Sequence, residues 1–241
     1  MGDAIFEHPR LAEVYDALDS DRSDLLVYAA IVDELGARRV LDIGCGTGVF
    51  ALMLAGAGLD VVAVDPAAAS LAVARAKPAA DRVRWVRGDA TALPPLLVDL
   101  ATMTGNVAQA IVEPVAWADT LRAVRAALVP GGHLVLETRD PHHRGWEEWT
   151  ATESRRTTGN ADVGAVESWV ELTDVSLPLV TFRTTWVFAA DGATLTSDST
   201  LRFRSREEVE ADLTTHGYDV IDVRDAPDRP GRELVFVARA R

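Results

Sequence analysis

The chain has 241 residues, of which 48% are hydrophobic, so it is long enough to bury a sizeable core in one α/β domain. Its 37 acidic residues outnumber the 24 lysines and arginines, and the net charge of −13 argues against nucleic acid, because phosphates attract a basic surface. A secretory signal is not predicted, no apolar run approaches the roughly 20 residues that cross a bilayer, and one cysteine excludes an internal disulfide. We therefore expect a cytoplasmic protein without nucleic-acid or membrane partners.

Residues 1–36 have the apolar spacing of amphipathic helices, and Gly36 is a plausible stop for the last of them. Helices placed before a first strand either pack on the sheet or lie over a ligand site. We predict an N-terminal helical cap, in which Tyr15, Arg22 and Tyr28 are the candidates to face a ligand. The alternative is that these three are ordinary packing and surface residues.

The segment Val40–Ala55, VLDIGCGTGVFALMLA, predicts a strand, a tight turn and a helix. Gly44, Gly46 and Gly48 supply backbone angles that other residues resist, and they let a ligand approach where no Cβ intervenes. A dinucleotide fingerprint, GxGxxG, requires glycine at its sixth position, where this chain has Val49. The spacing therefore disfavours NAD or FAD as the ligand. An NAD-linked reductase is kept as a disfavoured hypothesis.

Strands and helices alternate from residue 38 to residue 140. The apolar runs predict strands at 40–43, 61–64, 83–86, 97–102 and 133–138, and helices at 49–56, 67–77 and 114–128. Near-continuous apolar strands that alternate with helices are typical of a parallel sheet covered on both faces. Ligands of such sheets bind beyond the carboxyl ends of the strands.

After residue 140 the sequence becomes rich in Thr, Trp, Phe and Val, with partial alternation of period two. It predicts strands at 166–175, 179–188 and 195–204, and Asp191-Gly192 is a hairpin-turn signal between the last two. We expect a small antiparallel insertion over about residues 142–204, with a mobile loop at 154–164. A helix at 206–216 and strands at 218–224 and 233–238 then return to the main sheet.

Acidic residues stand at the ends of three successive predicted strands: Asp42, Asp65 and Asp89. Because the carboxyl ends of parallel strands meet at one edge, these carboxylates should project into one crevice. A carboxylate after the second strand can accept both hydroxyls of a ribose, and one after the third can accept an exocyclic amino group. An acidic crevice also favours a cationic ligand over a pyrophosphate.

Taken together, VLDIGCGTG, VVAVDP, GDA, VDLATMTGNV and PGGHLVLE resemble the class I S-adenosylmethionine-dependent methyltransferases over residues 35–140. The resemblance implies a single Rossmann-like domain with a seven-stranded sheet in the order 3-2-1-4-5-7-6, its last strand antiparallel. It also implies in-line methyl transfer from S-adenosyl-L-methionine, which becomes S-adenosyl-L-homocysteine, to a nitrogen or oxygen of a small molecule. The alternative is a cofactor-binding module without transfer activity, acting as a partner or sensor. We expect a monomer or a homodimer.

The resemblance also implies a set of cofactor contacts at the ends of the first four strands: Asp42, Gly44, Cys45 and Gly46 around the methionine part, Asp65, Pro66, Asp89 and Ala90 around the ribose and adenine, and Thr102 and Met103 around the sulfonium. Read without the resemblance, Cys45 is a small buried residue, because no base stands near it in the sequence.

A sulfonium methyl is already activated, so the protein must mainly align a nucleophile and exclude water. If the acceptor needs a base, His142 and His143 are the candidates, although adjacent loop histidines are more often solvated. Asn106, Trp146 and Trp149 are the candidate substrate contacts, because aromatic walls with few polar groups suit a small organic acceptor. No metal site is predicted.

Overall fold

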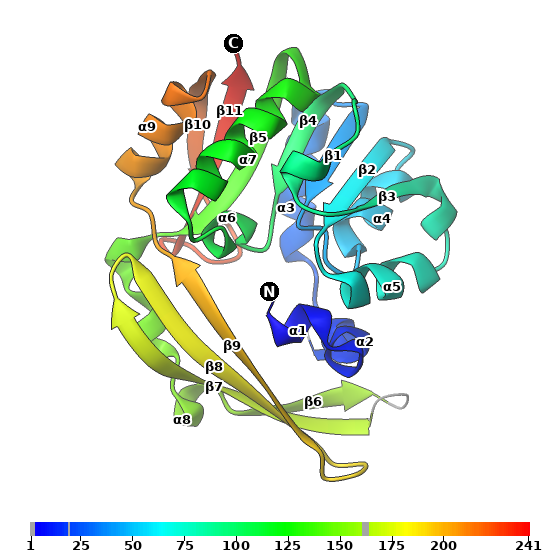
Figure 1. The fold of residues 1–241 in the computed structure, drawn as a ribbon, viewed down its shortest axis with the longest axis vertical. Coiled ribbons are helices and arrows are strands. Elements are labelled where there is room, and N and C mark those ends of the chain that lie inside the picture. The colour runs from blue at the N-terminus through cyan, green and yellow to red at the C-terminus, as the bar shows by residue number, and fades with distance from the viewer. Residues whose placement is uncertain (1–2, 19, 161–163) are drawn as a thin grey trace.

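The computed structural model describes residues 3–18, 20–160 and 164–241 (Figure 1). Seven strands form one sheet, in the spatial order β10 (Tyr218–Asp225), β11 (Glu233–Ala240), β5 (Leu128–Arg139), β4 (Val98–Met103), β1 (Arg39–Ile43), β2 (Asp60–Asp65) and β3 (Val83–Arg87). Strand β11 is antiparallel to β5 and to β10, and the other pairings are parallel. The predicted fold and strand order are confirmed.

Helices cover both faces of this sheet. Their bounds are α3 (Asp24–Glu34), α4 (Val49–Gly56), α5 (Ala68–Ala76), α6 (Val107–Ala110), α7 (Pro114–Ala127) and α9 (Arg206–Thr215). Pro114 opens α7 at a position where its fixed φ suits a first helical turn, and Ser205 and Glu208 form a capping box at the start of α9. Gly36 follows α3 with φ 64°, which confirms it as the predicted stop.

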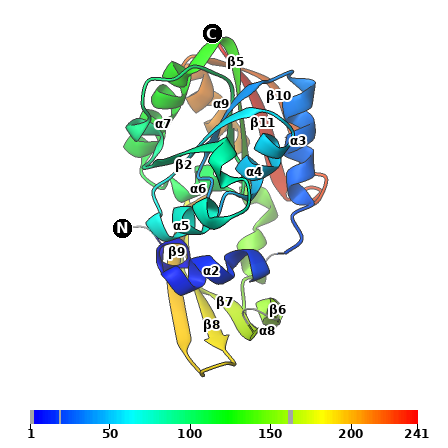
Figure 2. The ribbon, with the colours of Figure 1, turned by 90° about the vertical axis from the view of Figure 1, so that its right-hand side faces the viewer.

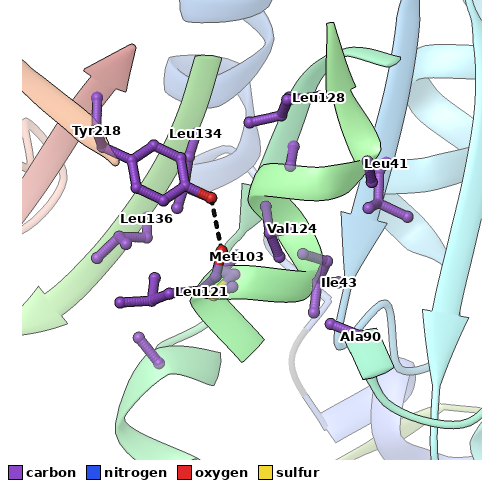
Figure 3. Packing of buried hydrophobic residues seen from close by; sticks show 14 of the residues in the cluster. Leu41, Ile43, Ala90, Met103, Leu121, Val124, Leu128, Leu134, Leu136 and Tyr218 are labelled. Atoms are coloured by element: carbon purple, nitrogen blue, oxygen red, sulfur yellow. Dashed lines mark hydrogen bonds between the residues drawn. The ribbon is translucent and has the colours of Figure 1, made fainter. Parts of the chain in front are cut away.

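Alternate residues of each central strand enter different halves of the core. Leu41, Met103 and Leu134 pack with Leu121 and Val124 of α7 on one face (Figure 3). On the same face, the buried hydroxyl of Tyr218 donates to the backbone carbonyl of Leu121 at 2.9 Å. The next residue along each strand points to the opposite face, which α3 and α4 cover.

A second, antiparallel sheet follows β5, as predicted. Its order is β6 (Arg156–Asn160), β7 (Gly164–Ser176), β8 (Leu179–Phe188) and β9 (Thr194–Arg202), and the short helix α8 (Ala151–Ser154) precedes it. The prediction of a loop over 154–164 was wrong at β6, because backbone pairing with β7 outweighs the polar composition of this segment. Residues 161–163, also part of that prediction, lie outside the described residues.

The N-terminal helices α1 (Ala4–Glu7) and α2 (Pro9–Leu18) lie between the two sheets (Figure 1 and Figure 2). Leu11 and Val14 of α2 are buried in one cluster with Val166, Trp186 and Phe188 of the second sheet. The backbone N–H of Ile5 donates to the hydroxyl of Ser197 at 3.0 Å. On the other side, the Ser70 hydroxyl in α5 donates to the backbone carbonyl of Phe6 at 2.9 Å.

Candidate functional site

A row of buried polar side chains crosses the carboxyl edge of the large sheet. The row consists of Asp65, Asp42, Thr102, Glu137 and Glu233. Each of them lies two positions along its strand from a buried apolar residue that packs on the face covered by α3 and α4. Residues two apart on a strand share a face, and the registers align Asp42 with Thr102 and Thr102 with Val135. We call these five residues the polar row.

Asp65, at the end of β2, connects the two turns that flank the row. Its Oδ2 accepts from the backbone N–H of Gly46, and its Oδ1 accepts from that of Ala67, each at 2.8 Å. Burial raises the pKa of Asp65, while the two backbone N–H groups act in the opposite direction. The side chain therefore holds the glycine turn against the β2–α5 turn.

The glycine turn leaves no room for side chains at two of its positions. Gly44 and Gly48 have φ of 69° and 79°, in the left-handed region that favours glycine. A Cβ at Gly44 would collide with Val107, and one at Gly48 would collide with the ring of Trp85. Side chains therefore pack directly on the turn at these two glycines, whereas a Cβ at Gly46 would meet nothing within 4 Å.

Asp42, at the end of β1, has an unused acceptor. Its Oδ1 accepts from the hydroxyl of Thr102 at 3.2 Å, and its buried Oδ2 has no hydrogen-bond partner in the described part of the chain. Burial raises the pKa of Asp42 to about 7, while the Thr102 hydrogen bond and the Arg22 guanidinium act in the opposite direction. A buried carboxylate oxygen without a partner suits a ligand that brings a hydrogen-bond donor or a cation.

Cys45 is half-buried between these two carboxylates. Burial raises the pKa of its thiol, and the negative charges of Asp42 and Asp65 raise it further. The side chain therefore stays a neutral thiol, which agrees with the expectation that it is not a nucleophile.

The predicted adenine contacts lie at the edge of the site. Asp89 is exposed, and its Oδ1 accepts from the backbone N–H of Thr91 at 2.9 Å and from the Thr91 hydroxyl at 2.6 Å. Asp89 thus caps the 3-10 turn Ala90–Ala92, and its Oδ2 remains available. Ala90 is buried and Pro66 is exposed. Their roles toward a cofactor stay predictions.

The end of β4 contributes one side chain to the site. Thr102 lies in the polar row beside Asp42. The side chain of Met103 is fully buried against Leu121 and Val124 on the opposite face (Figure 3), so only its backbone is placed to border a ligand.

Beyond β4, the row continues into a network of polar and charged groups, in which Asn106, Glu137 and Glu233 are buried and Arg229 is exposed. The backbone N–H of Asn106 donates to Glu137 Oε1 at 2.9 Å, and its Nδ2 donates to Glu233 Oε1 at 3.4 Å. Arg229 donates to the same Oε1 of Glu233 at 2.8 Å, and Arg139 Nε lies 3.7 Å from it. We call Asn106, Glu137, Arg139, Arg229 and Glu233 the Glu137 network.

Glu137 is the titratable centre of this network. Burial raises its pKa to about 7, and the negative charge of Glu233 acts in the same direction. The Asn106 N–H and the charges of Arg229 and Arg139 lower the pKa, but by less. Of the five residues, only Asn106 was named from the sequence, although a glutamate inside the apolar run HLVLE was a readable signal.

The predicted histidines lie outside this network. Both are exposed in the 3-10 turn Pro141–His143, and His142 Nδ1 lies 2.9 Å from Asp140 Oδ1. His142 has a side chain that is 78% exposed. A catalytic role for either histidine stays a prediction that this geometry does not support.

The two predicted tryptophans have different surroundings. Trp146 is buried edge-on against Phe203, with ring centroids 4.6 Å apart, so its side chain belongs to a packing core. Trp149 is half-buried, packs edge-on against Phe182 at 4.8 Å, and has the guanidinium of Arg139 5.5 Å from its ring centroid. The structure therefore brings Trp149 and Asn106 to the Glu137 network.

The N-terminal helices reach the site from above the glycine turn. Asp16 of α2 accepts from the hydroxyl of Thr47 at 2.5 Å and pairs with Lys77, whose Nζ donates to the Thr47 carbonyl at 2.7 Å. The positive charge of Arg22 lowers the pKa of Asp42. Burial lowers the pKa of Arg139, and Tyr15 acts in the opposite direction. Tyr28 is instead buried beside Phe50 in the core, as the alternative reading expected.

No group of three or more His, Cys, Asp or Glu side chains among the described residues could hold a metal ion. No helix in that part of the chain is long and apolar enough to cross a membrane.

A glycine turn joined to an acidic strand end, in a sheet of this order, defines the Rossmann-like fold of the class I methyltransferases. Residues 40–132 match the family model described as a methyltransferase domain. The chain therefore has the fold of the class I S-adenosylmethionine-dependent methyltransferases, and residues 40–132 are similar to a methyltransferase domain.

Solved structures share the fold over nearly the whole chain. An S-adenosylmethionine-dependent methyltransferase from Clostridium acetobutylicum ATCC 824 is 18% identical, with a TM-score of 0.76 and coverage of 97% of this chain and 98% of the other. The sugar N-methyltransferase KedS8 from Streptoalloteichus sp ATCC 53650 is 20% identical, with a TM-score of 0.77 and coverage of 100% and 96%. The methyltransferase CcbJ from Streptomyces caelestis is 21% identical, with a TM-score of 0.75 and coverage of 94% and 96%. No curated protein matches the chain.

Proposed function

We propose that this protein transfers a methyl group from S-adenosylmethionine to a nitrogen or oxygen of a small-molecule acceptor. The observation that carries the proposal is the polar row, which begins at the glycine turn with Asp65 and Asp42 and extends along the edge of the sheet to Glu137. Three proteins of similar fold add support. KedS8 is described as a sugar N-methyltransferase, CalS10 as an amino pentose methyltransferase bound to S-adenosylmethionine, and a third as a 1,6-didemethyltoxoflavin-N1-methyltransferase with bound 1,6-didemethyltoxoflavin and S-adenosylhomocysteine.

The residues at the glycine turn fit this cofactor. When bound, S-adenosylmethionine supplies a sulfonium methyl that is already activated toward a nucleophile. The unpartnered Oδ2 of Asp42 suits the ammonium of the methionine part, and Arg22, whose charge reaches Asp42, suits its carboxylate. An ionised carboxylate has about four acceptor positions, and backbone N–H groups occupy two of those on Asp65, so ribose hydroxyls fit the others.

We further propose that residues 1–241 act as one domain, in which the N-terminal helices cover the cofactor and the insertion at about 142–204 covers the acceptor. Contacts of α1 and α2 with both sheets support this arrangement. A cytoplasmic location and a monomeric or dimeric state stay predictions.

Calorimetry with S-adenosylmethionine and S-adenosylhomocysteine tests the cofactor. We expect both to bind, and we expect Asp65→Asn to weaken binding by about tenfold or more, because the amide cannot replace a charged acceptor for two hydroxyls. Absence of binding to the folded wild-type protein would refute the proposal, and displacement of the cofactor by NAD would favour the reductase.

Turnover separates an enzyme from a binding module. A panel of small amines and alcohols, read as release of S-adenosylhomocysteine, should contain at least one acceptor. Cofactor binding together with no release across a broad panel would favour the partner or sensor hypothesis.

A further inference from the structure

We propose that the acceptor is an amine that binds at the Glu137 network, where Glu137 accepts a proton from the reacting nitrogen. This inference rests on the proposed methyl transfer and names its acceptor class and its proton acceptor. It is built on the position of the network, on one unpartnered amide oxygen, and on the unequal charges around two carboxylates.

The Glu137 network lies next to the part of the polar row where the sulfonium is proposed to bind. Asp42 and Thr102 lie side by side at the ends of β1 and β4, where the methionine part and the sulfonium are proposed to bind. Thr102 aligns with Val135 of β5, and Glu137 lies two residues farther on the same face. A nucleophile placed beside Glu137 therefore adjoins the sulfonium end of the cofactor and not its adenine end.

The side-chain oxygen of Asn106 is an acceptor that no donor reaches in the described residues. Its side chain is buried, and its Oδ1 has no hydrogen-bond partner in the described ranges, although its N–H and Nδ2 both donate to carboxylates. Its φ of 62° holds it in the left-handed region, which asparagine tolerates better than most residues. A primary ammonium carries three donors and one positive charge, and so satisfies Asn106 Oδ1 together with a neighbouring carboxylate.

The two glutamates of the network are not equivalent. Glu233 accepts from Arg229 and Asn106 and adjoins the Arg139 guanidinium, so its negative charge is already compensated. Glu137 accepts one hydrogen bond, from the backbone of Asn106, and forms no ion pair in the described part of the chain. Glu137 is therefore the carboxylate that keeps its affinity for an added cation and for a proton.

The charges that face Glu137 come from every element packed around it. Glu233 of β11 raises its pKa, whereas Arg139 of β5 and Arg229 of the β10–β11 hairpin lower it. Burial lowers the pKa of Arg139, and Tyr15 of α2 acts in the opposite direction. With burial as the largest contribution, the pKa of Glu137 is about 7, close to neutral pH, which suits a group that takes up and returns a proton.

The proton transfer balances as follows for an acceptor that enters as an ammonium. One N–H bond breaks, an O–H bond forms on Glu137, and the electron pair stays on nitrogen as a free lone pair. That lone pair forms the new N–C bond, and the electron pair of the broken C–S bond remains on sulfur. The product leaves as a methylated ammonium, and Glu137 returns its proton to solvent.

Calorimetry with a matched pair of probes tests the inference without turnover. Cyclohexylamine and cyclohexanol have the same ring and differ in the charged nitrogen, and each is titrated into the full chain saturated with S-adenosylhomocysteine. We expect the amine to bind and the alcohol to bind at least about tenfold more weakly, since hydrogen bonds to charged groups contribute about 1.5–3 kcal/mol. Amine binding should strengthen as the pH rises through about 7, as Glu137 ionises.

Variants assign the effect to Glu137. Glu137→Gln should weaken amine binding about tenfold or more and remove its pH dependence, while S-adenosylhomocysteine binding stays within about twofold of wild type. Glu137→Asp keeps the charge and should keep the pH dependence. Glu171→Gln, an exposed glutamate of β7, is the control and should change neither ligand.

Three results would overturn the inference: no amine binding to the wild-type complex, equal binding of amine and alcohol, or unchanged amine binding in Glu137→Gln. If Glu137→Gln does not fold, Glu137→Asp decides the question: its shorter side chain should weaken amine binding several-fold while the pH dependence stays, and unchanged amine binding would overturn the inference. Failure of wild type to bind S-adenosylhomocysteine would instead refute the proposed function, so the two failures are distinguishable.

Discussion

At the scale of single residues, Asp65 has a structural role and a proposed ligand-binding role, and a single substitution removes both. Its oxygens hold the backbone N–H groups of Gly46 and Ala67, and it is also the proposed ribose ligand. From the sequence alone, Asp65→Ala is expected to weaken cofactor binding and to leave the fold intact. The structure adds a structural cost, because two backbone donors lose their acceptor.

We therefore expect Asp65→Ala to lower the free energy of unfolding of the ligand-free protein by about 1–3 kcal/mol. Urea denaturation without ligand measures this loss. Asp60→Ala is the matched control, since Asp60 is exposed at the other end of the same strand. Equal stability of Asp65→Ala and Asp60→Ala would contradict the bracing role.

The buried acid Asp42 makes stability depend on pH. Its pKa in the folded protein is about 7, whereas the ordinary value for aspartate is 3.8, so between these values the folded state holds a proton that the unfolded state has lost. The free energy of unfolding should therefore fall as the pH rises from about 4 to about 7 and level off above. Glu137 contributes in the same direction, between 4.5 and about 7.

Asp42→Asn should reduce this slope without abolishing it, because Glu137 remains. Urea midpoints at a series of pH values between 4.5 and 8, compared with wild type, measure the slope. An unchanged slope in Asp42→Asn would show that Asp42 is ionised in the folded protein throughout this range.

At the scale of elements, α2 joins three parts of the molecule. Its apolar side packs on the second sheet through Leu11 and Val14, and its polar side meets the glycine turn through Asp16. Asp16 pairs with Lys77 at the end of α5, and both side chains contact Thr47. The helix is thus fastened directly over the turn that is proposed to hold the cofactor.

Loss of this contact should loosen α2. We expect Asp16→Ala to speed the dissociation of S-adenosylhomocysteine several-fold and to speed limited proteolysis within residues 9–18, with little effect on global stability, because exposed and half-exposed ion pairs contribute at most about 1 kcal/mol. Stopped-flow displacement and protease digestion measure the two effects. Glu13→Ala, an exposed residue of the same helix, is the control and should behave as wild type.

At the scale of the whole molecule, Arg204 couples the insertion to the large sheet. It follows β9, is almost fully buried, and donates to the carbonyls of Ala108 and Ile111 at 2.8 and 2.7 Å. Its guanidinium also lies 4.6 Å from the ring centroid of Trp117 in α7. Burial lowers its pKa to about 10, which still leaves it charged at neutral pH.

We expect Arg204→Met to lower the free energy of unfolding by about 1–3 kcal/mol, because a buried carbonyl and a half-buried carbonyl lose a charged donor. Arg204→Lys should recover only part of this loss, since an ammonium cannot reproduce the planar fork. Thermal and urea denaturation measure both. Arg206→Met, two residues later and exposed on α9, is the control, and equal losses in the two methionine variants would contradict the coupling role.

Much of the fold was predictable, because its signals are local. The glycine turn, the proline that opens α7 and the period-two segments of β7 to β9 each report a backbone preference of neighbouring residues. The strand β6 was missed, because a polar segment acquires a strand conformation only through its pairing with β7. The Glu137 network was missed for a related reason: Asn106, Glu137 and Glu233 meet only after β4, β5 and β11 align.

The sequence by itself indicated the class of fold and the proposed cofactor end of the site, because a short run of glycines and the acids at strand ends are local signals. The order of the strands followed from the family resemblance. Only the tertiary structure decided which polar side chains share one buried edge. It placed the two histidines in solvent, Trp146 in a packing core and Glu137 beside an amide oxygen that lacks a donor. Burial and the proximity of charges distant in sequence set these environments, and neither quantity exists until the strands pair and the helices close over them.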